Sequence, residues 1–111
     1  MSEQRLIWVG ASIEDIRRFP PEARRRAGYE LHQVQSGLEP THWKPMPAIG
    51  AGVREIRIET GRAFRVIYLA RLPDAIAVLH VFEKRSAQTS RMDIALARER
   101  LRRLALDPDH L

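Results

Sequence analysis

Cysteine is absent from this sequence of 111 residues, and aromatic residues make up only 6% of it. Without cysteine, the chain has neither disulfides nor thiolate metal ligands, and nothing indicates an oxidising compartment. No stretch approaches the roughly 18 consecutive apolar residues of a membrane span, and the first ten residues lack the pattern of a signal peptide. We therefore expect a cytoplasmic protein with no membrane contact.

Metal-ligand spacing is also missing. The four histidines are scattered along the chain, and no group of carboxylates has the spacing of a metal site. Asp15, Glu22 and Asp93 each stand near the expected start of a helix, where a capping role explains them. The sequence therefore predicts no metal and no cofactor.

Lysine is scarce, because 17 of the 19 basic residues are arginine and only Lys44 and Lys84 are lysine. Basic residues exceed the 14 acidic ones, which gives a net charge of +5 and a sequence pI of about 10.7. A surface with this charge attracts polyanions, and salt weakens the attraction. Nucleic acid or an acidic protein is therefore the expected partner, and Lys44 is a candidate RNA-binding residue.

The chain length fits one compact domain over residues 1–111. Residues 5–9 predict a short strand, and Ser12 followed by Asp15 resembles a capping box at a helix start. Pro20 and Pro21 end that helix and start a second one, which runs to about Ser36. A strand and a hairpin of two helices are thus predicted in the first third of the chain.

Three strands are predicted next, over residues 53–59, 63–71 and 75–83. The turns Thr60-Gly61-Arg62 and Leu72-Pro73-Asp74 connect them into an antiparallel meander. The second and third strands are apolar on both faces, so the sheet is expected to be covered on both sides over part of its area.

Alternation along the third strand sets Ile76 and Val78 against Leu79 and Val81. A closing helix is predicted from near Ser90 to about 106. Together these elements give an α+β fold class.

A loop over residues 38–52 is the longest irregular segment, and long loops in compact domains are often functional. Trp43 lies in it. The indole has two interpretations, stacking on a nucleobase or closing the edge of the core, and we expect the second.

Charged residues inside the strands need a reason. Arg65 either binds phosphate or pairs with Glu55 or Glu59 across the ladder. His80 either transfers protons or is a buried histidine bonded to the helix layer, and we favour the second. If the strand stays regular to its end, His80, Phe82 and Lys84 share one face.

The run GVREIRIETGRAFRVIYLARLPDAIAVLHVFEKRSAQTS, the preceding loop KPMPAIGAGV and the final RERLRRL resemble HigB-like and phage-derived toxins of the RelE/ParE superfamily, a class of type II toxin-antitoxin systems. The resemblance covers nearly the whole chain. It implies a RelE-like fold, in which an N-terminal strand and a two-helix hairpin pack on an antiparallel meander with a C-terminal helix.

The resemblance also implies a function, that of a metal-independent endoribonuclease that cuts translated mRNA on the ribosome. In such cleavage the ribose 2′-hydroxyl attacks the neighbouring phosphate and leaves a 2′,3′-cyclic phosphate and a free 5′-hydroxyl. The implied partners are the ribosome, mRNA and a cognate helix-turn-helix antitoxin, through which alone the toxin would reach operator DNA.

Six residues are candidates for this chemistry. The resemblance assigns Arg65 to transition-state stabilisation and Arg57 and Arg85 to phosphate binding. Lys84 is the candidate for acid/base work, because crowding by guanidinium groups lowers the pKa of an ammonium. His80 is a further catalytic candidate, and Lys44 joins the phosphate-binding set.

One departure from the family pattern concerns the general base. Several ribonuclease members carry a tyrosine or histidine near the C-terminus, whereas here the last tyrosine is Tyr68 and the only late histidine is His110. The sequence therefore does not identify the base. Two alternatives stay open: a ParE-like inhibitor of DNA gyrase, against which the basic set argues, and a non-catalytic RNA-binding module, against which the low aromatic content argues.

Overall fold

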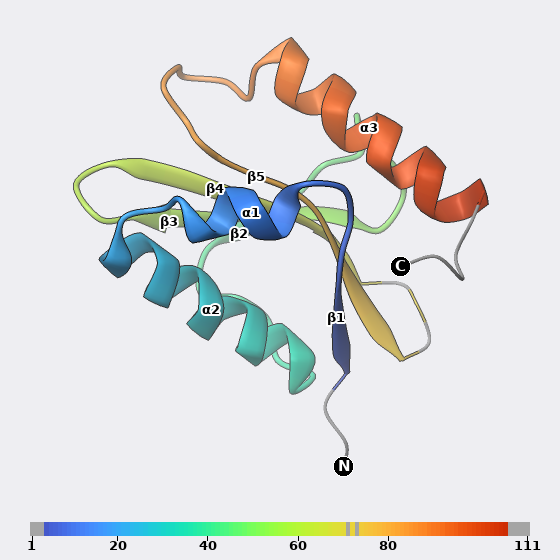
Figure 1. Cartoon of the computed structure of the whole chain (residues 1–111), viewed down its shortest axis with the longest axis horizontal. Helices are drawn as coiled ribbons and strands as arrows, with labels where there is room; N and C mark the ends of the chain where they lie inside the picture. The colour runs from blue at the N-terminus through green and yellow to red at the C-terminus, as the bar shows by residue number, and fades with distance from the viewer. Residues whose placement is uncertain (1–3, 71, 73, 107–111) are drawn as a thin grey trace.

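The computed structural model describes residues 4–70, 72 and 74–106. In these residues three helices accompany one five-stranded sheet, whose strand order is β1-β5-β4-β3-β2. Figure 1 shows how the helices lie around the sheet. β1 pairs with β5 in parallel, and the other neighbours are antiparallel. This α+β arrangement confirms the predicted fold class and is consistent with a RelE-like fold. The elements are β1 (Arg5–Trp8), α1 (Ser12–Arg17), α2 (Pro21–Gln35), β2 (Trp43–Pro45), β3 (Val53–Glu59), β4 (Ala63–Leu69), β5 (Ala75–Glu83) and α3 (Arg91–Leu106).

The predicted bounds of β3 and β5 are confirmed, whereas β2 lies inside the segment predicted to be irregular. Strand β2 has only three residues and ends in Pro45, so its sequence carries little strand signal. Arg71, Pro73 and His110 are outside the described residues. The predicted end of the second strand at Arg71 and the centre of the predicted Leu72-Pro73-Asp74 turn therefore also lie outside them.

The capping box predicted at Ser12 is wrong. The N-cap of α1 is Ala11, which makes no side-chain cap, and the buried Ser12 Oγ instead donates to the Val78 carbonyl at 3.1 Å. Ser12 therefore ties α1 to β5. At α3 the cap does form, because the Asp93 N–H donates to Ser90 Oγ at 3.1 Å and the Ser90 hydroxyl donates to Asp93 Oδ2 at 2.6 Å.

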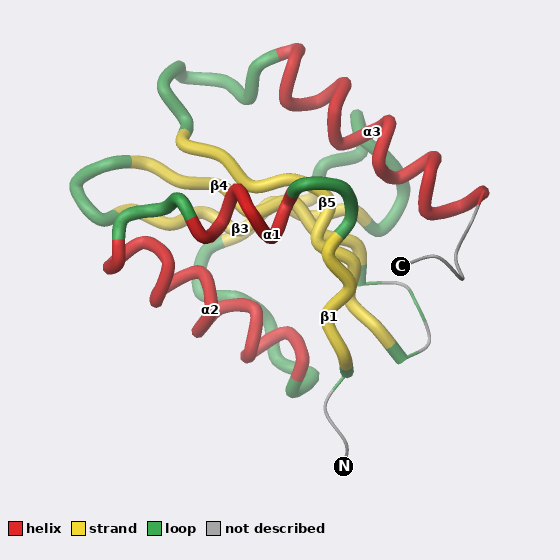
Figure 2. The backbone as a smooth tube through the Cα atoms, in the orientation of Figure 1, coloured by secondary structure: helices red, strands yellow, loops and turns green. Residues whose placement is uncertain are grey.

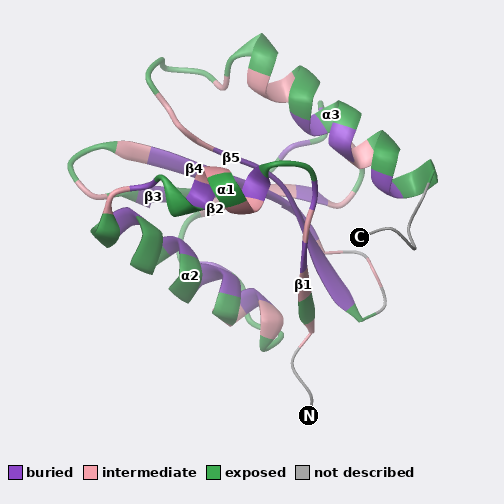
Figure 3. Cartoon of the chain, viewed as in Figure 1, coloured by how far each residue is buried: buried purple, intermediate pink, exposed green. Residues whose placement is uncertain are grey.

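Helices cover both faces of the sheet, as predicted. The backbone tube in Figure 2 shows α1 and α2 on one side and α3 on the other. The first face buries side chains such as Ile56, Phe64 and Val66 against α1 and α2. The second buries Ile67 and Leu79, among others, against α3. Figure 3 shows the buried residues following the strands and the inner sides of the helices.

A β-bulge changes which residues share a face. Ile67 lies opposite His80 and Tyr68 lies opposite Val78, so Leu79 is the extra residue in β5. Beyond it Val81 packs with Val78 on the α1/α2 face, and the prediction that Val81 shares a face with Leu79 is wrong. The bulge places His80 and Phe82 on the α3 face. Lys84 follows two residues after Phe82, just beyond the end of β5.

Among the described residues, no helix combines the length and the apolar character that crossing a membrane requires.

Candidate functional site

A buried carboxylate surrounded by basic side chains lies on the α3 face of the sheet. Glu55 in β3 has no exposed area. Its Oε2 accepts a hydrogen bond from Thr89 Oγ1 at 2.7 Å. Its Oε1 lies 3.6 Å from Arg65 Nε, 4.0 Å from Lys44 Nζ and 4.0 Å from Arg57 Nε. Within the described part of the chain this Oε1 has no hydrogen-bond partner.

Strand register brings these side chains together. Lys44 of β2 lies directly opposite Glu55, and Arg57 of β3 lies opposite Arg65 of β4. Glu55 and Arg57 are two residues apart and share a face, and side chains opposite each other across a ladder lie close enough to interact. Lys84 follows β5 at the same end of the sheet, where its N–H donates to the Ala63 carbonyl at 2.8 Å. We call Lys44, Glu55, Arg57, Arg65 and Lys84 the cationic cluster.

Arg65 forms the inner wall of the cationic cluster. Its side chain is 6% exposed. Nη1 donates to Glu59 Oε1 at 3.2 Å and to the Phe64 carbonyl at 2.9 Å, while Nε has no hydrogen-bond partner among the described residues. The ion-pair interpretation of Arg65 is therefore what the structure shows, with both Glu55 and Glu59 as partners.

Lys44 and Arg57 form the accessible part of the cationic cluster, with side chains 41% and 43% exposed. Four basic groups face Glu55 and Glu59, so the site keeps a net positive charge. Such a surface can hold a phosphate group.

The pKa of Lys84 is lowered, as the sequence predicted, but the first cause is burial rather than the predicted crowding by guanidinium groups. Burial lowers the pKa of its ammonium, and the Arg65 guanidinium lowers it further, while the Glu55 carboxylate acts in the opposite direction. Lys44 and Arg57 add smaller effects that also lower it. Lys84 can therefore lose a proton more readily than an ordinary lysine.

Two predicted site residues lie outside the cationic cluster. His80 is buried under α3, where its Nε2 is 2.6 Å from Asp93 Oδ1 and its ring stacks on Phe82 at 4.9 Å. This is the histidine bonded to the helix layer. Arg85 is exposed and donates to Glu83 Oε1 at 3.1 Å, on a carboxylate that Arg62 already holds with two bonds of 2.7 Å.

The sequence did not identify Glu55 and Thr89 as site residues. Glu55 entered only as a possible partner of Arg65, although an acidic residue two positions before Arg57 on the same strand face was a usable signal. Thr89 carried no such signal, since its contact depends on the path of the loop between β5 and α3. The described residues contain no group of three or more metal-ligating side chains placed to hold an ion.

Residues 14–102 match the family described as "Phage derived protein Gp49-like (DUF891)". The match extends from α1 into α3 and includes every residue of the cationic cluster. No curated protein matches the chain.

Proposed function

Because the chain belongs to the Gp49-like family of phage-derived proteins, which is toxin-like, we propose that it is the toxin of a type II toxin-antitoxin system and cuts mRNA on the ribosome. The observation that carries this proposal is the cationic cluster. The buried carboxylate of Glu55 lies among four basic side chains at one end of the α3 face of the sheet. Burying charge in this way is costly, and a role in positioning the basic groups would account for a buried carboxylate at this place.

The proposed reaction is attack of the ribose 2′-oxygen on the adjacent phosphorus, as the proton of its hydroxyl passes to solvent water, with cleavage of the bond to the 5′-oxygen. Arg57 and Lys44 bind the scissile phosphate from the exposed side, and Arg65 adds positive field from below as the phosphorane gains charge. Lys84 gives a proton to the leaving 5′-oxygen, a step that an arginine cannot perform because it does not release its proton.

Glu55 acts as a positioning residue in this proposal. It has no exposed area with which to touch RNA, but its carboxylate lies within 4.0 Å of three of the cations. Without it, four like charges would repel one another. The arrangement of Lys44 and Arg57 therefore depends on Glu55, whereas Arg65 is held by both Glu55 and Glu59.

An acidic antitoxin is the proposed protein partner. The net charge of +5 favours a negatively charged surface, and a helix-turn-helix antitoxin would connect the toxin to operator DNA. In the cell, the antitoxin would keep the cationic cluster from reaching ribosomes.

The first test adds the purified protein to a cell-free translation reaction and maps new mRNA 5′ ends. We expect cuts in the reading frame that require ribosomes and disappear in an Arg57→Ala, Lys84→Ala double variant. Arg26→Ala is the matched control, because Arg26 is an exposed arginine on α2. Intact mRNA with the wild-type protein would overturn the proposal. If the mRNA stays intact and the protein instead stops DNA gyrase from supercoiling DNA, gyrase is the target.

A further inference from the structure

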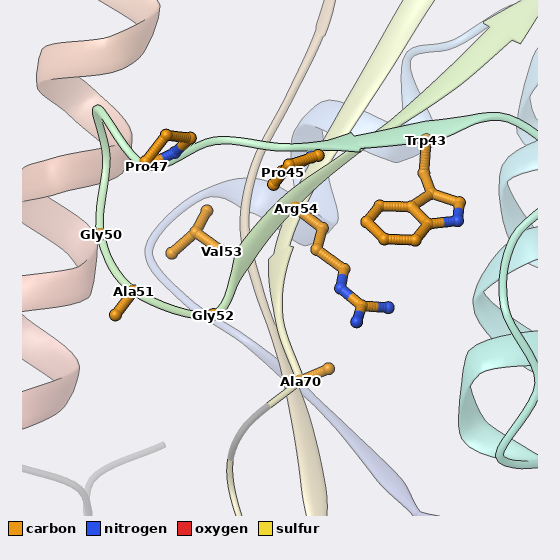
Figure 4. A pocket seen from close by; sticks show the side chains of 9 residues that line it. All are labelled: Trp43, Pro45, Pro47, Gly50, Ala51, Gly52, Val53, Arg54 and Ala70. Carbon is orange, nitrogen blue, oxygen red and sulfur yellow. The ribbon is translucent and has the colours of Figure 1, made fainter.

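A pocket of about 520 Å³ opens on the edge of the sheet, outside the cationic cluster. It lies between the loop over residues 46–52 and the end of β4, as Figure 4 shows. Its walls are mainly apolar, and its one charged lining residue is an arginine. The lining includes Trp43, Pro45, Pro47, Gly52, Arg54 and Ala70.

The arginine and the tryptophan of this pocket form a cation–π pair. The guanidinium carbon of Arg54 lies 4.1 Å from the centroid of the Trp43 ring. In Figure 4 the Arg54 side chain extends from β3 beside the indole and into the pocket. Its carboxylate neighbour, Glu39, is 3.7 Å away, which is beyond hydrogen-bond length. The guanidinium also lies near the Tyr68 hydroxyl, where it opposes the rise in pKa that burial causes, and with five N–H donors it keeps part of its fork for a ligand.

The pocket and the cationic cluster are joined through β2 and β3. Trp43 and Lys44 are consecutive in β2, and Arg54 and Glu55 are consecutive in β3, so in each pair the two side chains point to opposite faces. β2 is the edge strand of the sheet and has only three residues. A strand of RNA that crosses this edge can set a phosphate on Lys44 and the next base beside Trp43.

We propose that this pocket binds one nucleobase of the single-stranded mRNA, next to the nucleotide that is cut, and that it prefers guanine. The inference rests on the proposed function for the identity of the RNA. Aromatic rings and arginine planes bind unpaired bases by stacking. The fork of Arg54 matches the O6 and N7 acceptors of guanine, and the Glu39 carboxylate beside it can accept from the N1–H and N2 amino group.

An acidic peptide fits the pocket less well. It would bring further negative charge to Arg54, which already has Glu39 at 3.7 Å. Guanine instead supplies acceptors to the arginine and donors to the carboxylate. The charge pattern of the pocket thus favours a base over an acidic side chain.

The test uses the fluorescence of Trp43 in a Trp8→Phe background, where Trp43 is the one tryptophan left. The full-length protein is titrated with the four nucleoside monophosphates and with DNA hexamers that differ at one base and cannot be cleaved. We expect guanine to quench Trp43 at a concentration several-fold lower than the other bases. An added Arg54→Lys change keeps the charge. It should lower the ratio of the affinity for guanine to that for the other bases about tenfold, in line with the loss of one bidentate contact.

The controls make each outcome decisive. Arg26→Lys in the same background should bind like its parent, and Arg54→Gln replaces Arg54→Lys if circular dichroism shows the latter unfolded. The inference would be overturned if all four bases quench Trp43 equally and Arg54→Lys does not change this. It would also be overturned if only a Glu-Leu repeat peptide quenches Trp43. Guanine-selective quenching without mRNA cleavage would support the pocket and contradict the proposed nuclease, so the two failures are distinguishable.

Discussion

The two faces of the sheet are built from the same strands but differ in what their side chains do. On the α1/α2 face, alternate residues such as Ile56, Ile58 and Phe64 are apolar and at most 1% exposed. On the α3 face, the intervening residues begin with Val53 and continue with Glu55 and Arg57. The α1/α2 face is therefore an apolar core up to the edge where Trp43 and Arg54 line a pocket, and the α3 face is a core that changes into a charged site along its length.

The position of α3 accounts for this difference. It packs over Ile67 and Leu79, while in Figure 1 the turn that joins β3 and β4 extends beyond the helix. Arg57 near that turn is 43% exposed and carries its charge at lower cost, whereas Glu55 and Arg65 are buried and form ion pairs. A face that is only partly covered can thus form a packed core at one end and a binding site at the other.

The largest effect is expected from Lys84→Met on the charged face. Removal of a proton-transfer group should lower the rate of mRNA cleavage about 100- to 10,000-fold. The matched change on the other face is Phe64→Leu, which alters a residue that is 1% exposed. It should lower stability but leave the rate per folded molecule unchanged, as measured by cleavage assays normalised to folded protein.

The pH dependence of the rate sharpens the same prediction. Because the pKa of Lys84 is lowered, the ammonium form is lost at a lower pH than for an ordinary lysine. A step that needs the ammonium should therefore slow as pH rises through that pKa, below the usual value of 10.5. In Lys84→Arg, which stays protonated, this decline should disappear from the pH–rate profile, and an unchanged decline would assign it to another group.

The next effect concerns stability on the charged face. Glu55→Gln removes the negative charge that balances the buried Arg65, so we expect unfolding to become easier by about 3–5 kcal/mol, as for other broken buried pairs. The control is Glu59→Gln, whose carboxylate is 62% exposed and should cost no more than about 1 kcal/mol. Urea denaturation measures both. Equal losses for the two variants would show that Glu55 is not a special partner.

A smaller loss is expected where α3 joins the sheet. Asp93→Ala removes the cap shared with Ser90 and the contact with His80, and should cost about 0.5–2 kcal/mol. Glu99→Ala on the same helix loses only exposed pairs with arginines and should cost about 0.5 kcal/mol or less. Thermal denaturation followed by circular dichroism would rank the two, and the reverse order would contradict the role of Asp93.

The smallest effect is expected on the apolar face. Tyr68 is fully buried, and burial raises its pKa, while the Arg54 guanidinium opposite it acts in the other direction. No hydrogen bond of normal geometry joins its hydroxyl to another described residue. Tyr68→Phe should therefore leave stability unchanged or raise it by up to about 1 kcal/mol. A clear loss in urea denaturation would reveal a partner for the hydroxyl.

Sequence patterns predicted most of this fold because alternation and turn residues are local properties. They predicted β3 and β5 with the observed bounds, and Lys84 as a lysine with a lowered pKa. They missed β2, the parallel pairing of β1 and the bulge at Leu79, which depend on contacts between distant segments. The same holds for the site. The sequence predicted its basic residues one by one, but it did not predict that Glu55 is buried among them.

The parallel pairing of β1 with β5 has a consequence for how the protein is made. Ser12 at the start of α1 bonds to Val78 of β5, 66 positions later in the chain. At elongation rates of about 5–20 residues per second, β1 waits for several seconds before its partner strand exists. Long-range pairing of this kind also slows folding. The last strand to be synthesised thus completes both the sheet edge that holds β1 and the approach to Lys84, so a partly translated chain has neither a complete sheet nor a complete cationic cluster.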